Sequence, residues 1–291
     1  EVFFHFGFKG EKNIDFTEKI SFPPVLNKIP DTLLKSLLDN LMLILGISYW
    51  KMYCPKEIVI ESNFLTREQA EFWNIVYTKG LGEFFYKNKI DFKGLVQFPF
   101  IENVQNSVSF PRKDRALLGL GGGKDSIVTA EILKKQNKKF DLFTVGTSRI
   151  QEEAAAVIGK KPIRFKRELD LKLFDLNKEK GSYNGHIPIS AIYAILGLMA
   201  AIFYDYRSII VGNEKSALAI LVGRSTGVDV ACVRRAGQSI RRCSGIMRVV
   251  CQSGNLHQRH HRRVCTTIRP FHVASRRRCD IEHKELHVAA W

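Results

Sequence analysis

A loop of three glycines between an apolar segment and a helical pattern constrains the fold of this chain more than any other feature. Residues 116–120 are apolar and of strand length, and Gly121, Gly122 and Gly123 follow them. Glycine adopts positive φ at little steric cost, so this loop can turn its backbone N–H groups toward an anion. Asp125 and Ser126 are suited to cap the helix predicted next, whose N-terminus adds partial positive charge. The arrangement predicts a phosphate-binding loop.

Three phosphate-binding patterns compete for this loop. The Walker pattern needs glycine where Leu118 stands and serine or threonine where Asp125 stands. The dinucleotide pattern begins correctly with Gly119 and Gly121 but has Lys124 at its third glycine. Residues 121–126 instead resemble the PP-loop of N-type ATP pyrophosphatases, with glycine in place of the usual first serine. The alternative is a glycine turn that only packs a helix on a strand.

Residues 1–110 predict a smaller α+β domain at the N-terminus. Thr66 and Gln69 have the spacing of a capping box, and Cys54 is expected to be a buried structural thiol because no second cysteine lies within metal spacing. The elements predicted here are a strand or hairpin at residues 1–22 around Gly7 and Gly10, an amphipathic helix at 31–45, a strand at 57–61 and a helix from Thr66 to Gly80.

Residues 111–217 predict a parallel sheet with helices on both faces, because strand and helix patterns alternate along this part of the chain. The predicted strands are 116–120, 141–145, 163–166 and 208–211, and the predicted helices follow the glycine loop or span 149–158 and 188–204. Ligand sites of such sheets lie at the carboxyl ends of the strands. Val145 and Gly146, at one of these ends, are therefore candidate cofactor-binding residues beside the glycine loop.

The net charge of +16 is distributed unevenly. Residues 218–291 carry 13 Arg and 1 Lys against 4 acidic residues, with five of the six Cys and six of the eight His. The cysteines form no C-x-x-C zinc pattern. We interpret this segment as a frameshifted, non-native or disordered tail, so its charge predicts no nucleic-acid partner.

No segment of the sequence is predicted to cross a membrane. The longest apolar run, residues 191–204, is shorter than the roughly 20 residues that a span requires. No signal peptide is visible either. We therefore expect a cytoplasmic protein without a membrane partner.

Separated motifs in a fixed order resemble one enzyme family. The matching stretches are residues 48–51, 54–55, 80–86, 120–126, 184–188 and 212–217. They resemble the ATP-dependent UDP-N-acetylmuramoyl-L-alanyl-L-glutamate epimerases of bacterial cell-wall synthesis. The resemblance covers most of residues 1–217 and is expected to stop there.

The resemblance implies an enzyme that inverts the terminal L-glutamate of a nucleotide-linked muramoyl dipeptide, its small-molecule substrate. It implies consumption of ATP with Mg²⁺ and release of AMP and pyrophosphate. A carboxylate activates its own α C–H poorly, because deprotonation would place negative charge beside negative charge. Joining the carboxylate to AMP as an acyl-adenylate would remove this obstacle.

Site roles follow from the resemblance and from residue type. The N–H groups of residues 121–124 and the Ser126 hydroxyl are expected to hold the phosphates, with Lys124 adding charge or lying in solvent, and Asp125 to bind Mg²⁺. The candidates for proton transfer are His186, Glu214 and Lys215. A lone histidine is more often structural, and Glu214 with Lys215 also fits an ion pair that shapes a loop.

Two other functions compete with the epimerase. The first is another PP-loop adenylating enzyme, such as one that modifies tRNA or forms an amide. The second is a basic nucleic-acid-binding protein, which rests on the tail alone. Because a non-native tail would leave the active-site edge open to water, we expect the chain as given to lack epimerase activity.

Overall fold

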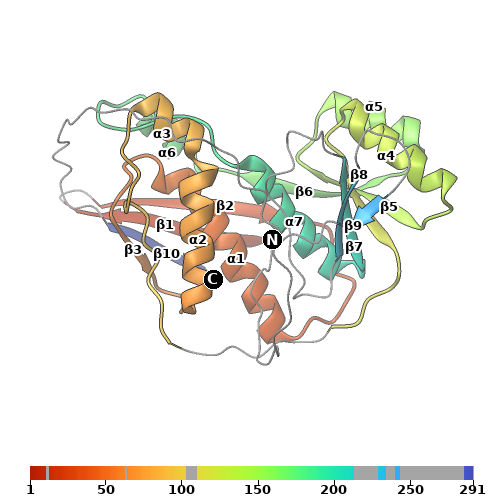
Figure 1. Ribbon diagram of the computed structural model, residues 1–291, viewed down its shortest axis with the longest axis horizontal. Coiled ribbons are helices and arrows are strands. Elements are labelled where there is room, and N and C mark those ends of the chain that lie inside the picture. The colour runs from red at the N-terminus through yellow and green to blue at the C-terminus, as the bar shows by residue number, and fades with distance from the viewer. Residues whose placement is uncertain are drawn as a thin grey trace.

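The computed structural model describes residues 1–10, 13–62, 64–102 and 110–212, together with the backbone of three strands at 229–233, 240–242 and 285–290. The predicted proton-transfer residues Glu214 and Lys215 lie outside the described residues, as does most of the predicted tail. In the part described, the chain is an α/β structure with a mixed sheet and seven helices (Figure 1).

The elements follow the predicted order closely. The helices are α1 (Asp31–Trp50), α2 (Arg67–Gly80), α3 (Gly82–Asn88), α4 (Lys124–Lys135), α5 (Arg149–Ile158), α6 (Lys172–Leu176) and α7 (Ile189–Phe203). The strands are β1 (Val2–Lys9), β2 (Ile14–Ser21), β3 (Glu57–Ile60), β4 (Ala116–Gly119), β5 (Phe140–Val145), β6 (Pro162–Glu168), β7 (Ser208–Gly212), β8 (Asp229–Val233), β9 (Ile240–Arg242) and β10 (Glu285–Ala290). The short helices α3 and α6 were not predicted. Strands β8, β9 and β10 were not predicted either, and they lie in the segment that we expected to be a frameshifted, non-native or disordered tail.

One sheet runs through the described structure in the order β3-β10-β1-β2-β6-β5-β4-β7-β8-β9. Strands β6, β5, β4 and β7 are parallel neighbours, as the alternating pattern predicted. The hairpin β1–β2 is antiparallel, and β2 pairs antiparallel with β6 through Lys19 and Glu168. The sheet is therefore continuous from the N-terminal hairpin to the parallel strands, while the domain division at residue 110 stays a prediction.

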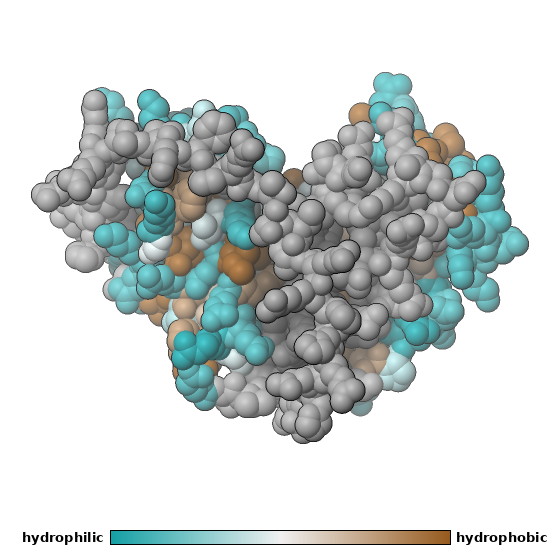
Figure 2. Space-filling view, in the orientation of Figure 1, coloured by the Kyte–Doolittle hydropathy of each residue, from teal (hydrophilic) through white to brown (hydrophobic). Residues whose placement is uncertain are grey.

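Helices cover both faces of the parallel strands. On β4, Leu117 belongs to the core that contains α1 and α7, whereas Leu118 belongs to a second core that contains α4 and α5. Successive strand residues point to opposite faces, so the apolar run of β4 supplies both cores. Figure 2 shows mainly hydrophilic residues, with some hydrophobic ones among them, at the end of the molecule that carries α4 and α5.

Helix α1 extends five residues beyond the predicted end and lies in the larger core. Its C-terminal half is buried throughout, and it packs against α7. Among the described residues it is the one helix that is long and apolar enough to cross a membrane by length and composition. A buried core helix has the same composition, and its packing inside the protein accounts for its apolar residues.

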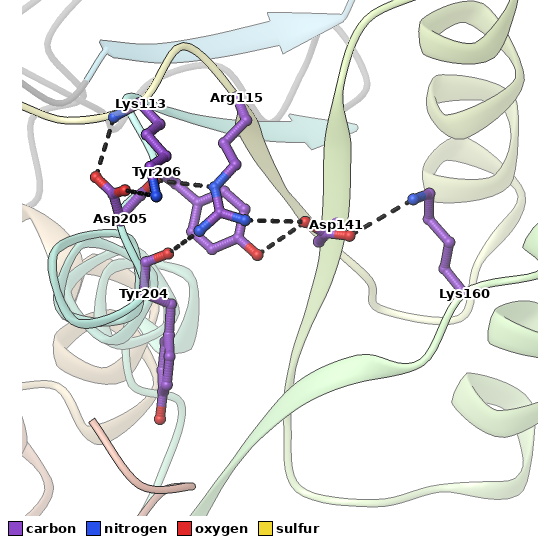
Figure 3. Close-up of polar contacts among 7 residues, drawn as sticks. All are labelled: Lys113, Arg115, Asp141, Lys160, Tyr204, Asp205 and Tyr206. Atoms are coloured by element: carbon purple, nitrogen blue, oxygen red, sulfur yellow. Dashed lines mark hydrogen bonds and ion pairs between the residues drawn. The ribbon is translucent and has the colours of Figure 1, made fainter. Parts of the chain in front are cut away.

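Polar residues connect the amino ends of the parallel strands, at the edge opposite the glycine loop (Figure 3). Tyr206, just before β7, donates its hydroxyl to Asp141 at the start of β5 over 2.9 Å. Lys160 and Arg115 lie within ion-pair distance of the same carboxylate, and the Arg115 guanidinium stacks on the Tyr206 ring. These contacts connect β4, β5 and β7 at one end and leave their carboxyl ends free for a ligand site.

Candidate functional site

The glycine loop connects β4 to α4, as predicted. Gly122 has a φ of +87°, and a Cβ there would lie 2.7 Å from the Ile150 side chain, so only glycine fits. Gly123 is the N-cap of α4, and no side chain in the described part of the structure caps the helix. The prediction that Asp125 or Ser126 caps α4 is therefore wrong, because both lie inside its first turn. Within the described residues the Ser126 N–H donates to the Gly123 carbonyl over 3.2 Å, and the N–H groups of Lys124 and Asp125 remain available for an anion.

A cavity of about 430 Å³ lies at the carboxyl ends of the parallel strands, beside the glycine loop. Its volume is typical of small-molecule sites. The strands β4, β5 and β7, the first turn of α4 and the N-terminal half of α7 all contribute to its wall. The predicted convergence of strand ends with the glycine loop is confirmed. The lining residues include Gly119, Gly121, Gly123, Lys124, Asp125, Ser126, Thr144, Val145, Gln151, Ser190, Tyr193 and Gly212.

The donor set of this cavity suits a phosphate-bearing ligand. Gly121 and Gly123 are exposed, and a Cβ at either would meet no atom within 4 Å, so space exists directly above the loop backbone. Lys124 is exposed at the rim. The Thr144 side chain is buried and its hydroxyl has no partner among the described residues. A buried hydroxyl without a partner is costly, and a ligand in the cavity would supply one.

The two side chains predicted to act on phosphate and metal both line the cavity. Ser126 is buried and donates its hydroxyl to the Gly123 carbonyl over 2.8 Å, so it would have to rotate to donate to a phosphate. Asp125 is partly exposed. Among the described residues no three His, Cys, Asp or Glu side chains are grouped as a metal site. Mg²⁺ often binds through one or two carboxylates plus phosphate oxygens, so Asp125 alone is compatible with it.

The other predicted cofactor-binding residues lie close to the cavity, but not all of them line it. Val145 lines the cavity at the end of β5. Gly146 and Gly122 turn the chain beside it without contributing to its wall. Gly212 approaches α4 so closely that a Cβ would lie 2.7 Å from the Asp125 carbonyl oxygen. The end of β7 is thereby held against the first turn of α4.

Of the predicted proton-transfer residues, the structure describes only His186. It is exposed, lies outside the cavity wall and precedes α7 by three residues. Ser190 and Tyr193, farther along α7, do line the cavity. The histidine therefore belongs to the segment that leads into the cavity wall.

Sequence reasoning did not single out four polar lining residues: Thr144, Gln151, Ser190 and Tyr193. Thr144 directly precedes the predicted Val145–Gly146 pair, so the strand-end argument could have included it. Gln151 Nε2 donates to the Leu120 carbonyl over 3.4 Å and connects α5 to the residue before the glycines. No local pattern signals Ser190 or Tyr193, because they reach the cavity only when α7 packs on the sheet.

The sequence of this chain matches one known protein family. A family model described as the MurL N-terminal domain matches residues 1–227. The match continues past Ala217, so the expectation that the resemblance stops there is corrected.

Curated relatives carry one common name, UDP-N-acetyl-alpha-D-muramoyl-L-alanyl-L-glutamate epimerase. A protein from Xanthomonas oryzae is 33% identical over 189 residues, which cover 64% of this chain and 41% of the relative. One from Micromonospora is 32% identical over 208 residues, which cover 69% of this chain and 46% of the relative. The chain thus spans less than half the length of these relatives.

Proposed function

This chain belongs to the MurL N-terminal domain family, and from that premise we propose that it binds ATP and Mg²⁺ for epimerisation of a nucleotide-linked muramoyl dipeptide. The terminal L-glutamate of UDP-N-acetylmuramoyl-L-alanyl-L-glutamate would become D-glutamate. One observation carries the proposal: a glycine loop with an uncapped helix N-terminus borders a cavity at the carboxyl ends of parallel strands.

In this proposal the β4–α4 connection acts as a PP-loop. The open backbone above Gly121 and Gly123 and the first N–H groups of α4 would bind the phosphates, with Lys124 adding charge at the rim. Asp125 would hold Mg²⁺. ATP would supply activation of the glutamate carboxylate as an acyl-adenylate, with release of pyrophosphate and later of AMP. His186 remains the candidate for proton transfer among the described residues.

Binding of ATP by the full chain tests the first part of the proposal. Isothermal calorimetry with Mg²⁺ is expected to show binding that weakens in EDTA. Asp125→Ala is expected to weaken Mg·ATP binding by about tenfold or more, which is ~1.4 kcal/mol, without lowering the melting temperature. Glu131→Ala is the matched control, because Glu131 lies on the exposed face of the same helix. Equal ATP binding in EDTA would overturn the metal assignment.

The acceptor of the adenylyl group is tested by following AMP. Release of AMP that depends on the L-glutamyl dipeptide nucleotide, together with L-to-D conversion, supports the epimerase. Release that depends on tRNA or on an amine would favour another adenylating enzyme. If the tail is non-native, as its composition predicts, the chain binds ATP without conversion. Failure to bind ATP at all would overturn the proposal.

A further inference from the structure

Lys51, at the C-terminal end of α1, is buried without a counter-charge. Its side chain is about 5% exposed, and Nζ donates to the Asn184 side-chain oxygen over 3.1 Å. Within the described residues no carboxylate lies at ion-pair distance from this ammonium group. Burial lowers the pKa of Lys51, against a smaller opposing effect of Cys54. The lysine thus has a neutral amide as its partner.

Such a cation is expensive to bury, which argues against a purely stabilising role. Removing an ammonium group from water costs several kcal/mol, and one neutral hydrogen bond offsets only part of that. Arg167 is the contrasting case, because its buried guanidinium is paired with the Glu18 carboxylate. A methionine in place of Lys51 would fill similar space without the desolvation cost. The role of Lys51 therefore lies in the loop before α7, to which its ammonium group is hydrogen-bonded.

The ammonium group of Lys51 connects α1 to the loop that precedes α7. The Asn184 side-chain oxygen that it binds also accepts from the Gly185 N–H over 2.8 Å, so this oxygen has two donors. The Asn184 backbone carbonyl accepts from the Asn88 side chain at the end of α3 over 3.1 Å. One residue earlier, the Tyr183 N–H donates to the Met52 carbonyl over 2.7 Å. Three separate parts of the chain meet at Asn184.

This loop leads directly into the cavity wall. His186 follows the anchored residues, Pro188 is the N-cap of α7, and Ser190 and Tyr193 line the cavity. Asn184 and Gly185 are exposed, so packing alone does not hold them in place. Their position depends on the hydrogen bonds from α1 and α3.

We propose that Lys51 is a positioning residue whose ammonium group fixes Asn184 and thereby places His186 at the entrance to α7. The inference rests on the proposed function, in which His186 is a candidate for proton transfer. It predicts that Lys51 acts on the loop and on turnover, and not on the binding of ATP, because neither Lys51 nor Asn184 lines the cavity beside the glycine loop.

Lys51→Met tests the proposal, with Lys79→Met as control because Lys79 is an exposed lysine in the last turn of α2. In Lys51→Met, hydrogen exchange at the Gly185 amide is expected to accelerate about tenfold or more, while the melting temperature stays the same or rises. The NMR resonances of the His186 ring are expected to shift. The affinity for Mg·ATP should remain unchanged, and any turnover should fall in kcat with little change in KM for ATP.

Asn184→Ala provides a second test, because it removes the same hydrogen bond from the loop side. It also leaves the buried Lys51 ammonium group without this partner, so its melting temperature is expected to fall. It should accelerate exchange at Gly185 as Lys51→Met does, and the double variant should add nothing further. Unchanged Gly185 exchange and unchanged His186 resonances in Lys51→Met would overturn the proposal, as would a large fall in melting temperature with the loop still protected. Absence of ATP binding in every variant, the unmodified chain included, would instead count against the proposed function.

Discussion

At the scale of single residues, burial decides the chemistry of the side chains that sequence patterns single out. Cys54 was predicted to be a buried structural thiol, and it is about 1% exposed, with Sγ donating to the Lys51 carbonyl over 3.5 Å. Burial raises the pKa of Cys54 from 9.0 to about 12, and the nearby Lys51 opposes this only in part. The thiolate is the reactive form of cysteine, so the native thiol is unreactive.

The first prediction follows from this burial. In the native chain, iodoacetamide at pH 8 is expected to leave Cys54 unmodified for hours, and denaturation is expected to expose it at once. Because the folded pKa is the higher one, Cys54 contributes stability below pH 9 that is lost as the pH rises toward 12. Peptide mapping by mass spectrometry separates Cys54 from the other five cysteines. Rapid native labelling at pH 8 would contradict the prediction.

At the scale of elements, hydrogen bonds of side chains to the backbone fix where helices begin. Thr66 and Gln69 form the predicted capping box, with Thr66 Oγ1 accepting from the Gln69 N–H over 3.3 Å. The Gln69 side chain in turn accepts from the Thr66 N–H over 2.8 Å. In α4 the corresponding N-terminus has no side-chain cap. Among the described residues, helix α4 thus leaves its first two N–H groups for a ligand, whereas the capping box of α2 satisfies N–H groups at its own N-terminus.

The second prediction concerns the cap of α2. Thr66→Ala is expected to lower the free energy of unfolding by about 1 kcal/mol, because the Gln69 N–H loses its partner. Thr66→Asn supplies another capping oxygen and should retain most of the stability. Urea denaturation followed by tryptophan fluorescence measures both variants. Equal destabilisation by alanine and asparagine would show that the capping bonds contribute little.

At the scale of the whole molecule, one buried ion pair joins the N-terminal hairpin to the parallel strands. The Glu18 carboxylate of β2 accepts from Arg167 Nε of β6 over 2.5 Å and from the Tyr49 hydroxyl of α1 over 2.9 Å. Arg167 also donates to the Ser48 hydroxyl over 2.8 Å. Burial raises the pKa of Glu18, while Arg167 acts in the opposite direction. The pair lies where the two parts of the sheet meet.

The third prediction is that this pair couples the two parts. Arg167→Met leaves a buried carboxylate unpaired and should destabilise the protein by about 3–5 kcal/mol. Lys166→Met, an exposed change on the same strand, should cost little. Combining Arg167→Met with Glu18→Leu is expected to recover most of the loss. If hydrogen exchange accelerated only in residues 1–110 of Arg167→Met, the two parts would be independent domains.

The sequence by itself determined the local elements of this protein. The glycine loop, the capping box of α2 and the left-handed Gly159 that ends α5 each depend on residues a few positions apart. The alternation of strand and helix patterns likewise predicted the parallel strands and the edge where their ends meet. In these cases the interacting residues lie within one turn, one loop or one strand, so a short stretch of sequence is enough to predict the structure.

Only the tertiary structure decided which distant residues meet. The pairing of β2 with β6, the arrival of Tyr193 at the cavity and the contact of Lys51 with Asn184 join segments far apart in the chain. None of them leaves a periodic pattern, because each depends on how whole faces of helices pack on the sheet. A buried lysine is therefore indistinguishable from a surface lysine in the sequence, and its neighbours appear only when the core has formed.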